Sequence, residues 1–409
     1  MDGAPARSRQ EGEPAVLGRV KSSVGRYYRV STEEESSMSK NTTQIKAAVV
    51  REKGGPFKVE TLTLEAPRRD EVLVKVAATG LCHTDMVARD KGYPVPHPIV
   101  LGHEGAGIVE SVGADVVKVA PGDSVVLTFL TCGRCKSCRL GRIAHCEKTF
   151  PLCFGGTRLD GSTATLDGDG EKVHDHFFGQ SSFATYALAN ERNVVKVSRD
   201  VPLERLGPLG CGIQTGAGAV MNALNVRPGT SFASFGAGAV GCSAIMAARA
   251  VGATTIVAID IVPLRLELAK ELGATHIINS KQTNPVEAIR DITRGGVDYS
   301  LEASGEPRAL HQAIEALGSL GTCGVVGAEP LGTEVSFDVN NLMIPGKEIC
   351  GILEGESVPD IFIPQLIELN AQGRFPFEKL VKFYSLDQIN QAAHDSENGG
   401  TIKPIIRLM

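Results

Sequence analysis

Four cysteines stand close together in the first half of this 409-residue chain. They are Cys132, Cys135, Cys138 and Cys146, separated by two, two and seven residues. Four thiolates satisfy tetrahedral zinc and leave no open position, which is the arrangement of a structural site. A ferredoxin-type iron–sulfur run has a shorter last gap followed by proline, whereas here the last cysteine is followed by Glu147. The spacing therefore predicts a structural zinc in preference to an iron–sulfur cluster or plain buried thiols.

A second set of potential metal ligands is scattered along the chain. Cys82, His103 and Cys211 would offer two thiolates and an imidazole, leaving a fourth position for water or substrate, as a catalytic zinc requires. Such a zinc acts as a Lewis acid. Glu104 is an alternative ligand or an electrostatic neighbour, and Asp85 is suited to hold the second ring nitrogen of His103. Spacing alone does not assemble residues this far apart, so a buried histidine without a metal is the competing interpretation.

The third pattern is rich in glycine. Gly236, Gly238 and Gly241 form a Gly-x-Gly-x-x-Gly motif directly after an apolar strand and at the start of a helix-period stretch. The glycines allow a tight turn and let a pyrophosphate approach the helix N-terminus. Asp260 follows 19 residues after Gly241, where a carboxylate favours NAD over NADP; Arg265 nearby tempers that preference. The alternative is a structural glycine-rich turn.

The composition is that of an ordinary globular protein. Apolar residues make up 42% of the chain, charged residues 22%, and the formal charge is −5. Acidic and basic residues are interspersed, so no basic face for nucleic acid is expected. The longest apolar region, residues 233–259, contains Arg249 and several glycines and does not read as a membrane span. Because no secretory signal is recognisable and the cysteines suit a reducing compartment, we expect a cytoplasmic protein without a membrane partner.

The expected pattern of secondary structure changes near residue 213. Residues 1–44 have little periodicity and are expected to form a disordered extension, with Met38 as an alternative start. Residues 45–212 have mostly β character, and residues 359–370 and 402–408 are expected as a helix and a strand. From residue 213, strands alternate with helix-period stretches, which implies a parallel, doubly wound sheet. The strands expected there are 231–235, 255–259, 276–278, 299–302 and 322–326, and the helices are 240–250, 264–271, 285–292 and 309–317.

These motifs together resemble those of the zinc-dependent medium-chain alcohol dehydrogenases, over roughly residues 45–409. The resemblance is carried by Gly102-His103-Glu104 with Gly107 and Val112, the four-cysteine lobe, the run Gly210 to Gly216, and the glycine motif. Residues 354–366 and 388–392 look most like the aryl (benzyl) alcohol dehydrogenase branch. The resemblance implies an α/β fold: a GroES-like, mostly β catalytic domain at 45–212 and 353–409, and a Rossmann coenzyme domain with a doubly wound parallel sheet at 213–352.

The resemblance also assigns roles to individual residues. It implies two zinc ions per chain, one held by Cys82, His103 and Cys211 and one by the four-cysteine lobe. Thr84 matches the hydroxyl that takes the substrate proton. His83 and Lys403 match residues that contact the cofactor phosphate, and Thr215 and Val240 match residues that pack against the nicotinamide.

One position departs from the pattern of the family. Many members have a histidine five residues after the first zinc cysteine, where it ends a proton relay to solvent. Here that position is Val87. His83 is a nearby imidazole of suitable pKa, so we hypothesise that it serves as the proton exit instead.

The substrate pocket is predicted by the resemblance alone. Tyr93, Phe177 and Phe178 fall where the family lines its pocket, and an aromatic lining suits a flat apolar alcohol. The alternative for each of the three is an ordinary core aromatic. Residues 174–176, with two histidines and an aspartate, could suggest a further metal, but a solvated loop is the preferred interpretation.

The expected activity follows from these assignments. The sequence predicts an NAD-dependent zinc alcohol dehydrogenase that reversibly oxidises a primary aromatic or allylic alcohol to its aldehyde, and a homo-oligomer, either dimer or tetramer. The cofactor would carry the redox step. The alternatives are a zinc dehydrogenase for polyols or for the glutathione adduct of formaldehyde and, more remotely, a non-catalytic NAD-binding protein on the same fold.

Overall fold

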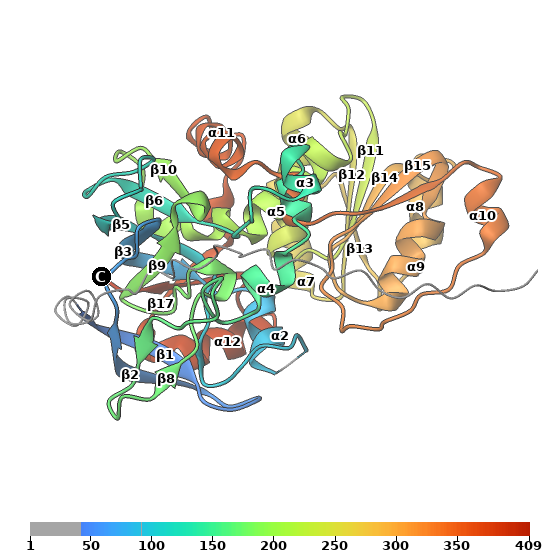
Figure 1. Cartoon of the computed structure of the whole chain (residues 1–409). Helices are drawn as coiled ribbons and strands as arrows, with labels where there is room; N and C mark the ends of the chain where they lie inside the picture. The colour runs from blue at the N-terminus through green and yellow to red at the C-terminus, as the bar shows by residue number, and fades with distance from the viewer. Residues whose placement is uncertain (1–41, 91) are drawn as a thin grey trace, which may run out of the picture. The chain divides into compact units, whose positions relative to one another are not determined.

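The structure, a computed structural model, describes residues 42–90 and 92–409 (Figure 1). Most of the predicted N-terminal extension and the alternative start at Met38 lie outside these residues. The extension was predicted to run to residue 44, and this end point is wrong because strand β1 begins at Thr43. Gln44 pairs with Thr63 of the neighbouring strand, so the regular structure starts before the first apolar residue of the strand, Ile45.

Two sheets are built largely from antiparallel strands in the first half of the chain. The five-stranded sheet has the order β4 (Ile99–Val100), β1 (Thr43–Val50), β2 (Phe57–Leu64), β7 (Thr165–Leu166) and β8 (Lys172–Val173). The second sheet has the order β10 (Val194–Val197), β6 (Ser124–Leu127), β5 (Glu104–Val112), β3 (Glu71–Gly80), β18 (Lys403–Arg407) and β17 (Val381–Ser385), and β9 (Tyr186–Asn190) also pairs with β3.

The end of the chain returns to this second sheet. Strand β18 runs antiparallel to β3, with Ile405 opposite Gly80, and parallel to β17. A strand can pair with a partner hundreds of residues away because its backbone groups need partners wherever they are buried. The last residues of the protein therefore lie beside Gly80, directly before the segment that carries Cys82.

The third sheet consists of six parallel strands, as the alternation of strands and helices predicted. Its order is β13 (His276–Asn279), β12 (Thr255–Asp260), β11 (Ser231–Phe235), β14 (Val297–Glu302), β15 (Leu317–Val325) and β16 (Glu348–Gly351). Parallel neighbours need a crossover, here usually a helix. The helices are α6 (Ala239–Val251), α7 (Pro263–Leu272), α8 (Pro285–Thr293), α9 (Pro307–Glu315) and α10 (Val339–Met343).

Three of these helices, α7, α8 and α9, begin with proline, which is pre-organised for the first helical position. Several boundaries differ from the sequence prediction by one or two residues, and the largest difference is at the start of β15. Leu317 was expected in a helix but opens β15, because the register of that strand shifts between Val297 and Tyr299 of its neighbour and Leu320 takes a φ of 61°. Because of this irregularity, the alternation of apolar and polar residues does not indicate a strand here. The sheets and their crossover helices confirm the predicted α/β class.

The remaining helices belong mostly to connections and to the C-terminal part. They are α2 (His83–Arg89), α3 (Lys136–Arg139), α4 (Thr149–Cys153), α5 (Gly212–Gly218), α11 (Pro359–Ala371) and α12 (Ile389–Glu397). One apolar cluster contains Ala106 and Val126 of the second sheet together with Phe232 and Ile245 of the parallel-sheet half. Helix α5 supplies Ile213 to the same cluster. In residues 42–90 and 92–409, no helix is both long and apolar enough to cross a membrane.

Candidate functional site

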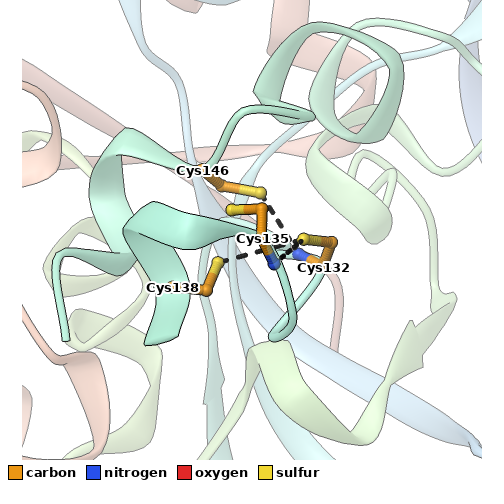
Figure 2. A group of neighbouring side chains, drawn as sticks. All are labelled: Cys132, Cys135, Cys138 and Cys146. Carbon is orange, nitrogen blue, oxygen red and sulfur yellow. Dashed lines mark hydrogen bonds between the residues drawn. The ribbon is translucent and has the colours of Figure 1, made fainter. Parts of the chain in front are cut away.

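The four-cysteine lobe forms a closed cage of sulfur atoms (Figure 2). All four Sγ atoms lie within 4.8 Å of one another. Cys135 is the N-cap of α3, Cys138 lies within that helix, and Cys146 follows a short 3-10 turn at Ile143–His145. The left-handed φ of 67° at Gly133 lets the chain turn between the first two cysteines. The cage has the donor set and the compactness that tetrahedral zinc requires.

Backbone amides point at these sulfur atoms. The Cys135 amide donates to Cys132 Sγ at 3.3 Å, and the Cys132 amide donates to Cys146 Sγ at 3.3 Å. The Arg134 amide does most to lower the pKa of Cys132, to about 6. Amide donors of this kind stabilise thiolates, the form in which cysteine binds a metal. All ten cysteines lie in the described part of the chain and none of them forms a disulfide.

The second predicted set of ligands also comes together in space. Ligand atoms of Cys82, His103, Glu104 and Cys211 lie within 4.8 Å of one another. Cys82 is the N-cap of α2, His103 and Glu104 stand where β5 begins, and Cys211 directly precedes α5. Three separate elements therefore deliver the set, which is why its spacing in the sequence is irregular.

The imidazole of His103 has the environment of a metal ligand. Its Nδ1 lies 2.9 Å from Asp85 Oδ1, and Asp85 also accepts from the amides of Cys82 and Gly102. The other ring nitrogen, Nε2, is buried and has no hydrogen-bond partner among the described residues. A buried polar atom of this kind calls for a partner. Two thiols and an open imidazole nitrogen fit zinc, with Asp85 fixing the ring as metal-bound histidines usually require.

The carboxylate of Glu104 forms an ion pair with Lys403. Its two carboxylate oxygens each lie 2.9 Å from Lys403 Nζ, and Oε1 also accepts from the Gly212 amide. Both side chains are buried, at 0% and 2% exposure. Burial opposes the charged form of Lys403, but Glu104 and the nearby thiols outweigh it, so the pKa of Lys403 is raised. The two opposite charges balance each other, and the pair lies next to the metal-type ligands.

This pairing corrects the predicted role of Lys403. A contact with cofactor phosphate needs an accessible ammonium group, whereas that of Lys403 is buried and already bonded to Glu104 and to the Leu81 carbonyl. Lys403 is therefore a partner of Glu104. The other predicted phosphate contact, His83, is exposed on the first turn of α2.

The aromatic residues predicted for the substrate pocket gather around His103. The ring of Phe178 stacks on the imidazole with centroids 4.4 Å apart, and the ring of Phe177 meets it edge-on at 5.5 Å. Tyr93 reaches the same group through Phe154, at 5.0 Å, and Phe154 lies 5.2 Å from Phe178. Sequence reasoning missed Phe154. Phe177 has no exposed surface, so its pocket assignment is corrected to a core aromatic beneath His103, while Tyr93 and Phe178 keep some exposure.

The segment before these aromatics is also corrected. Residues 174–176 were expected to be solvated, but Asp175 and His176 are buried. His176 Nδ1 lies 2.5 Å from Asp175 Oδ1, and its Nε2 lies 3.5 Å from Glu71 Oε1, which also accepts from Arg158. Burial opposes a charged imidazole, yet the two carboxylates raise the pKa of His176 to about 9. His176 and Phe178 both have left-handed backbone, so this charge cluster anchors the strained turn that stacks on His103.

The glycine motif has the geometry of a dinucleotide cradle. Gly236 has a φ of 107°, and a Cβ on Gly241 would lie 1.9 Å from the Gly236 carbonyl oxygen. At Gly238, the N-cap of α6, a Cβ would meet nothing within 4 Å, so the backbone faces open space. The first turn of α6 has no side-chain cap. Free amides at a helix N-terminus bind a pyrophosphate.

Asp260 closes the far side of this cradle. It stands at the end of β12 and accepts from the amide of Ala237 at 2.8 Å and from the amides of Ile261 and Val262. These bonds fix the carboxylate beside the glycine turn. The Nε atom of Arg265 is buried without a hydrogen-bond partner in the described structure.

Helix α5 links the cradle to the metal-type ligands. Cys211 precedes α5, and Thr215 lies within it. A Cβ on Gly216 would lie 2.0 Å from the carbonyl oxygen of Val240 in α6, so the two helices touch backbone to backbone. Thr84 stands on α2, with its Oγ1 3.8 Å from Cys82 Sγ. The predicted metal, proton-handling and cofactor residues are thus neighbours.

A further carboxylate, Glu354, was not predicted. It is 7% exposed, and its Oε1 lies 3.6 Å from Cys211 Sγ and its Oε2 3.5 Å from Thr215 Oγ1. Burial raises the pKa of Glu354 to about 7. Glu354, Gly355 and Glu356 all have positive φ values, of 48°, 65° and 51°. The sequence signal was a run of charged residues after an apolar strand, which reads as a surface turn unless its backbone is known.

Comparisons with known proteins support the same assignment. The model of the alcohol dehydrogenase GroES-like domain matches residues 68–199, and that of the zinc-binding dehydrogenases matches residues 239–371. A geraniol dehydrogenase of Castellaniella defragrans is 48% identical over 362 residues, which is 88% of this chain and 96% of that protein.

Two crystal structures resemble the whole described fold. An alcohol dehydrogenase zinc-binding domain protein from Burkholderia ambifaria is 63% identical, with a TM-score of 0.89, and covers 90% of this chain and 100% of its own. A benzyl alcohol dehydrogenase from Acinetobacter calcoaceticus is 55% identical, with a TM-score of 0.87 and the same coverage. With the two ligand sets and the dinucleotide cradle already in place, these matches show that the chain belongs to the zinc-dependent medium-chain alcohol dehydrogenases.

Proposed function

We propose that this alcohol dehydrogenase reversibly oxidises a primary aromatic or allylic alcohol to its aldehyde, with NAD as the hydride acceptor. The observation that carries the proposal is the environment of His103. Its Nε2 is buried without a partner beside the thiols of Cys82 and Cys211, while Asp85 holds the other nitrogen. The dinucleotide cradle of α6 is joined to this ligand set by α5.

When bound, zinc supplies Lewis-acid polarisation of the substrate oxygen and NAD supplies the hydride acceptor. The chain's residues position these groups. Cys82, His103 and Cys211 hold the metal, and the Asp85 carboxylate keeps the imidazole in one tautomer and one orientation. A lobe of four further cysteines holds a second zinc, so the proposal includes two zinc ions per chain.

Thr84 is proposed to receive the hydroxyl proton of the alcohol. Its Oγ1 lies 3.8 Å from Cys82 Sγ, which puts the hydroxyl beside the ligand set. His83 follows Cys82 directly and is exposed, so its imidazole can pass the proton to water. Val87 lies on the same helix and has no proton to exchange. The test is the pH dependence of hydride transfer in His83→Ala, and an unchanged rate and profile would exclude His83.

An apolar, flat substrate is favoured by the aromatic cluster. Tyr93, Phe154 and Phe178 form a chain of ring contacts that ends on the imidazole of His103. Aromatic side chains bind flat apolar ligands through stacking and edge contacts. The relatives whose names specify geraniol and benzyl alcohol are dehydrogenases for one allylic and one aromatic alcohol, which agrees with this choice.

NAD is favoured over NADP by Asp260. Its carboxylate is held beside the glycine turn by three backbone amides, where it would accept from ribose hydroxyls and repel a 2′-phosphate. Arg265 is the nearby cation that could pair with the 2′-phosphate of NADP. Titration with NAD and NADP measures this preference directly.

The test of the proposed function is a steady-state substrate panel. Benzyl, cinnamyl, terpenoid and short aliphatic alcohols are compared with a polyol and with the glutathione adduct of formaldehyde, each with NAD and with NADP. We expect the highest kcat/KM for benzyl, cinnamyl or terpenoid alcohols with NAD. A preference for the polyol or the charged adduct would overturn the substrate class. Metal analysis giving one zinc per chain, with no alcohol oxidised, would point to a non-catalytic protein.

We also propose a homo-oligomer, either a dimer or a tetramer. Strand β16 lies at one edge of the six-stranded sheet, and Ile349 on it is exposed. Exposed apolar side chains nearby include Val339, Met343 and Ile344. An edge strand with apolar neighbours is suited to pairing with a second copy. Light scattering of the purified protein measures the subunit number.

We also propose a cytoplasmic location. The free thiols favour a reducing compartment.

A further inference from the structure

Glu354 is a buried carboxylate without a cation. Among the described side chains no lysine, arginine or histidine forms an ion pair with it, in contrast to Glu104, which is paired with Lys403. It contacts the Cys211 thiol at 3.6 Å and the Thr215 hydroxyl at 3.5 Å, both long distances for a hydrogen bond. Buried charges are ordinarily paired or bound to a ligand, so this carboxylate calls for a partner.

The backbone holds Glu354 in this place against a local preference. Two glutamates, Glu354 and Glu356, adopt left-handed φ values that cost energy for residues with a Cβ. Gly355 between them packs so closely on α5 that a Cβ there would lie 2.4 Å from the Gln214 carbonyl oxygen. Strain of this kind persists where the surroundings fix the conformation, and it is concentrated at functional sites.

Three anchors fix the segment. Ser357 Oγ donates to Gln214 Oε1 at 2.8 Å, and Asn222 Nδ2 donates to the Gly355 carbonyl at 3.1 Å. Glu356 pairs with His145, which precedes the last cysteine of the four-cysteine lobe. The carboxylate of Glu354 is therefore presented toward Cys211 and Thr215 by a framework that does not use that carboxylate itself.

Neither contact of Glu354 supplies a positive charge. The long contact with Cys211 Sγ offers Oε1 only a weak thiol donor, so Oε1 is open to a positive group or a stronger donor. The Thr215 hydroxyl at 3.5 Å does not neutralise a charge.

The group that must arrive there follows from the proposed function, on which this inference rests. Hydride passes directly between the alcohol carbon and the nicotinamide, so the ring must lie beside the metal ligands. A dinucleotide anchored at the N-terminus of α6 reaches them along α5, because Gly216 of α5 touches Val240 of α6. Thr215 stands on that route, within 3.5 Å of Glu354. The oxidised ring is a cation, whereas the reduced ring is neutral.

We propose that Glu354 determines the specificity of the site for the redox state of the cofactor, because its unpaired carboxylate stabilises the cationic ring of NAD⁺ and gives the neutral ring of NADH no such stabilisation. The consequence is that Glu354 shifts the ratio of the two affinities toward the oxidised cofactor. Glu354 thereby acts on the cofactor-binding steps on either side of hydride transfer.

The test compares equilibrium binding of NAD⁺ and NADH to the zinc-loaded protein, without substrate, by calorimetry and by NADH fluorescence at a single mildly alkaline pH. Glu354→Gln keeps the shape of the side chain and removes its charge. We expect the Kd for NAD⁺ to rise about tenfold, the effect of losing one partly screened ionic contact, and the Kd for NADH to change less than twofold. The matched control is Glu356→Gln, which removes a carboxylate of the same segment that faces His145, and it should leave the ratio of the two Kd values unchanged.

Each outcome decides the matter. Equal changes in both Kd values for Glu354→Gln would mean a structural role and would overturn the proposal, as would no change in either. Glu354→Asp, which retains the charge, should recover most of the preference for NAD⁺, and it serves as the test if Glu354→Gln does not fold. A wild-type protein that binds neither NAD⁺ nor NADH would refute the proposed function itself. Normal binding with an unaltered ratio in Glu354→Gln would refute this inference alone.

Discussion

Asp85 Oδ1 lies 2.9 Å from the Nδ1 atom of His103, and both side chains are fully buried. The same carboxylate accepts from the amides of Cys82 and Gly102, so one side chain ties together two of the three proposed zinc ligands. A carboxylate behind a metal-bound imidazole fixes the ring and raises its basicity. Asp85 thus fixes the orientation of the His103 ring and the backbone of Cys82 together.

Replacing Asp85 should weaken the site without dismantling the fold. In Asp85→Asn the amide can satisfy only part of this network, so we expect the affinity of the catalytic site for zinc to fall roughly 10- to 100-fold. Competition with a chelator, followed by zinc analysis, measures the change. The control is Asp90→Asn at the exposed end of the same helix. Equal zinc affinity in Asp85→Asn and wild type would contradict the arrangement.

Lys403 should matter for stability and not for cofactor affinity. Lys403→Met leaves the buried carboxylate of Glu104 without its cation, which costs on the order of 3–5 kcal/mol in the free energy of unfolding. Urea denaturation measures this value. The double variant Lys403→Met, Glu104→Gln should recover part of the loss. A large fall in NAD affinity with normal stability would restore the phosphate-binding role.

The buried charges around His176 predict a pH-dependent stability. The pKa of His176 is raised from 6.5 to about 9, so its contribution is complete below pH 6.5 and is lost as the pH rises toward 9. Burial alone would raise the pKa of Glu71, but hydrogen bonds from His176 and Arg158 lower it from 4.5 to about 2, so its contribution is lost as the pH falls through that range.

His176→Asn tests this prediction, since asparagine tolerates the left-handed backbone at this position. The difference in the free energy of unfolding between wild type and variant should be largest just below pH 6.5 and should shrink between pH 6.5 and 9. Denaturation curves across a pH series give that difference. A difference that stays constant from neutral to alkaline pH would show that the imidazole is uncharged in the fold.

Removing one thiol from the four-cysteine lobe should remove one zinc. Cys135→Ser is expected to lower the zinc content from two ions to one per chain and to destabilise the lobe, because three thiolates hold a structural zinc poorly. Cys153→Ser is the matched control, as Cys153 is buried near the lobe but outside the cage. Metal analysis of both proteins decides the point. Unaltered zinc in Cys135→Ser would argue against a four-sulfur site.

Much of this site could be read from local sequence. The four cysteines from Cys132 to Cys146 belong to one short segment, so their spacing reports their geometry. The glycines at 236, 238 and 241 likewise act over a single turn, where backbone approach requires residues without a Cβ. Patterns of this kind survive because the residues that form them are neighbours in the chain.

The rest depended on contacts that no local pattern encodes. Lys403 and Glu104 are 299 positions apart, so their pairing depends on β18 taking its place beside β3. The sequence around Glu354 carries no local signal of its burial, and that burial is explained by the left-handed backbone there and by the packing of Gly355 on α5. His176 was misjudged for the same reason, because Glu71, which faces its Nε2 and also pairs with Arg158, comes from elsewhere in the chain.

The position of β18 sets the order in which this site can be assembled. Synthesis proceeds from the N-terminus, and segments that have left the ribosome begin to fold before the chain is finished. The proposed metal ligands and the cofactor cradle all precede β18 in the chain, but the cation that neutralises Glu104 stands on β18. Until β18 has been synthesised and has paired with β3, the buried carboxylate of Glu104 therefore has no cation to balance it, so docking of this late strand completes the charge balance beside the proposed metal ligands.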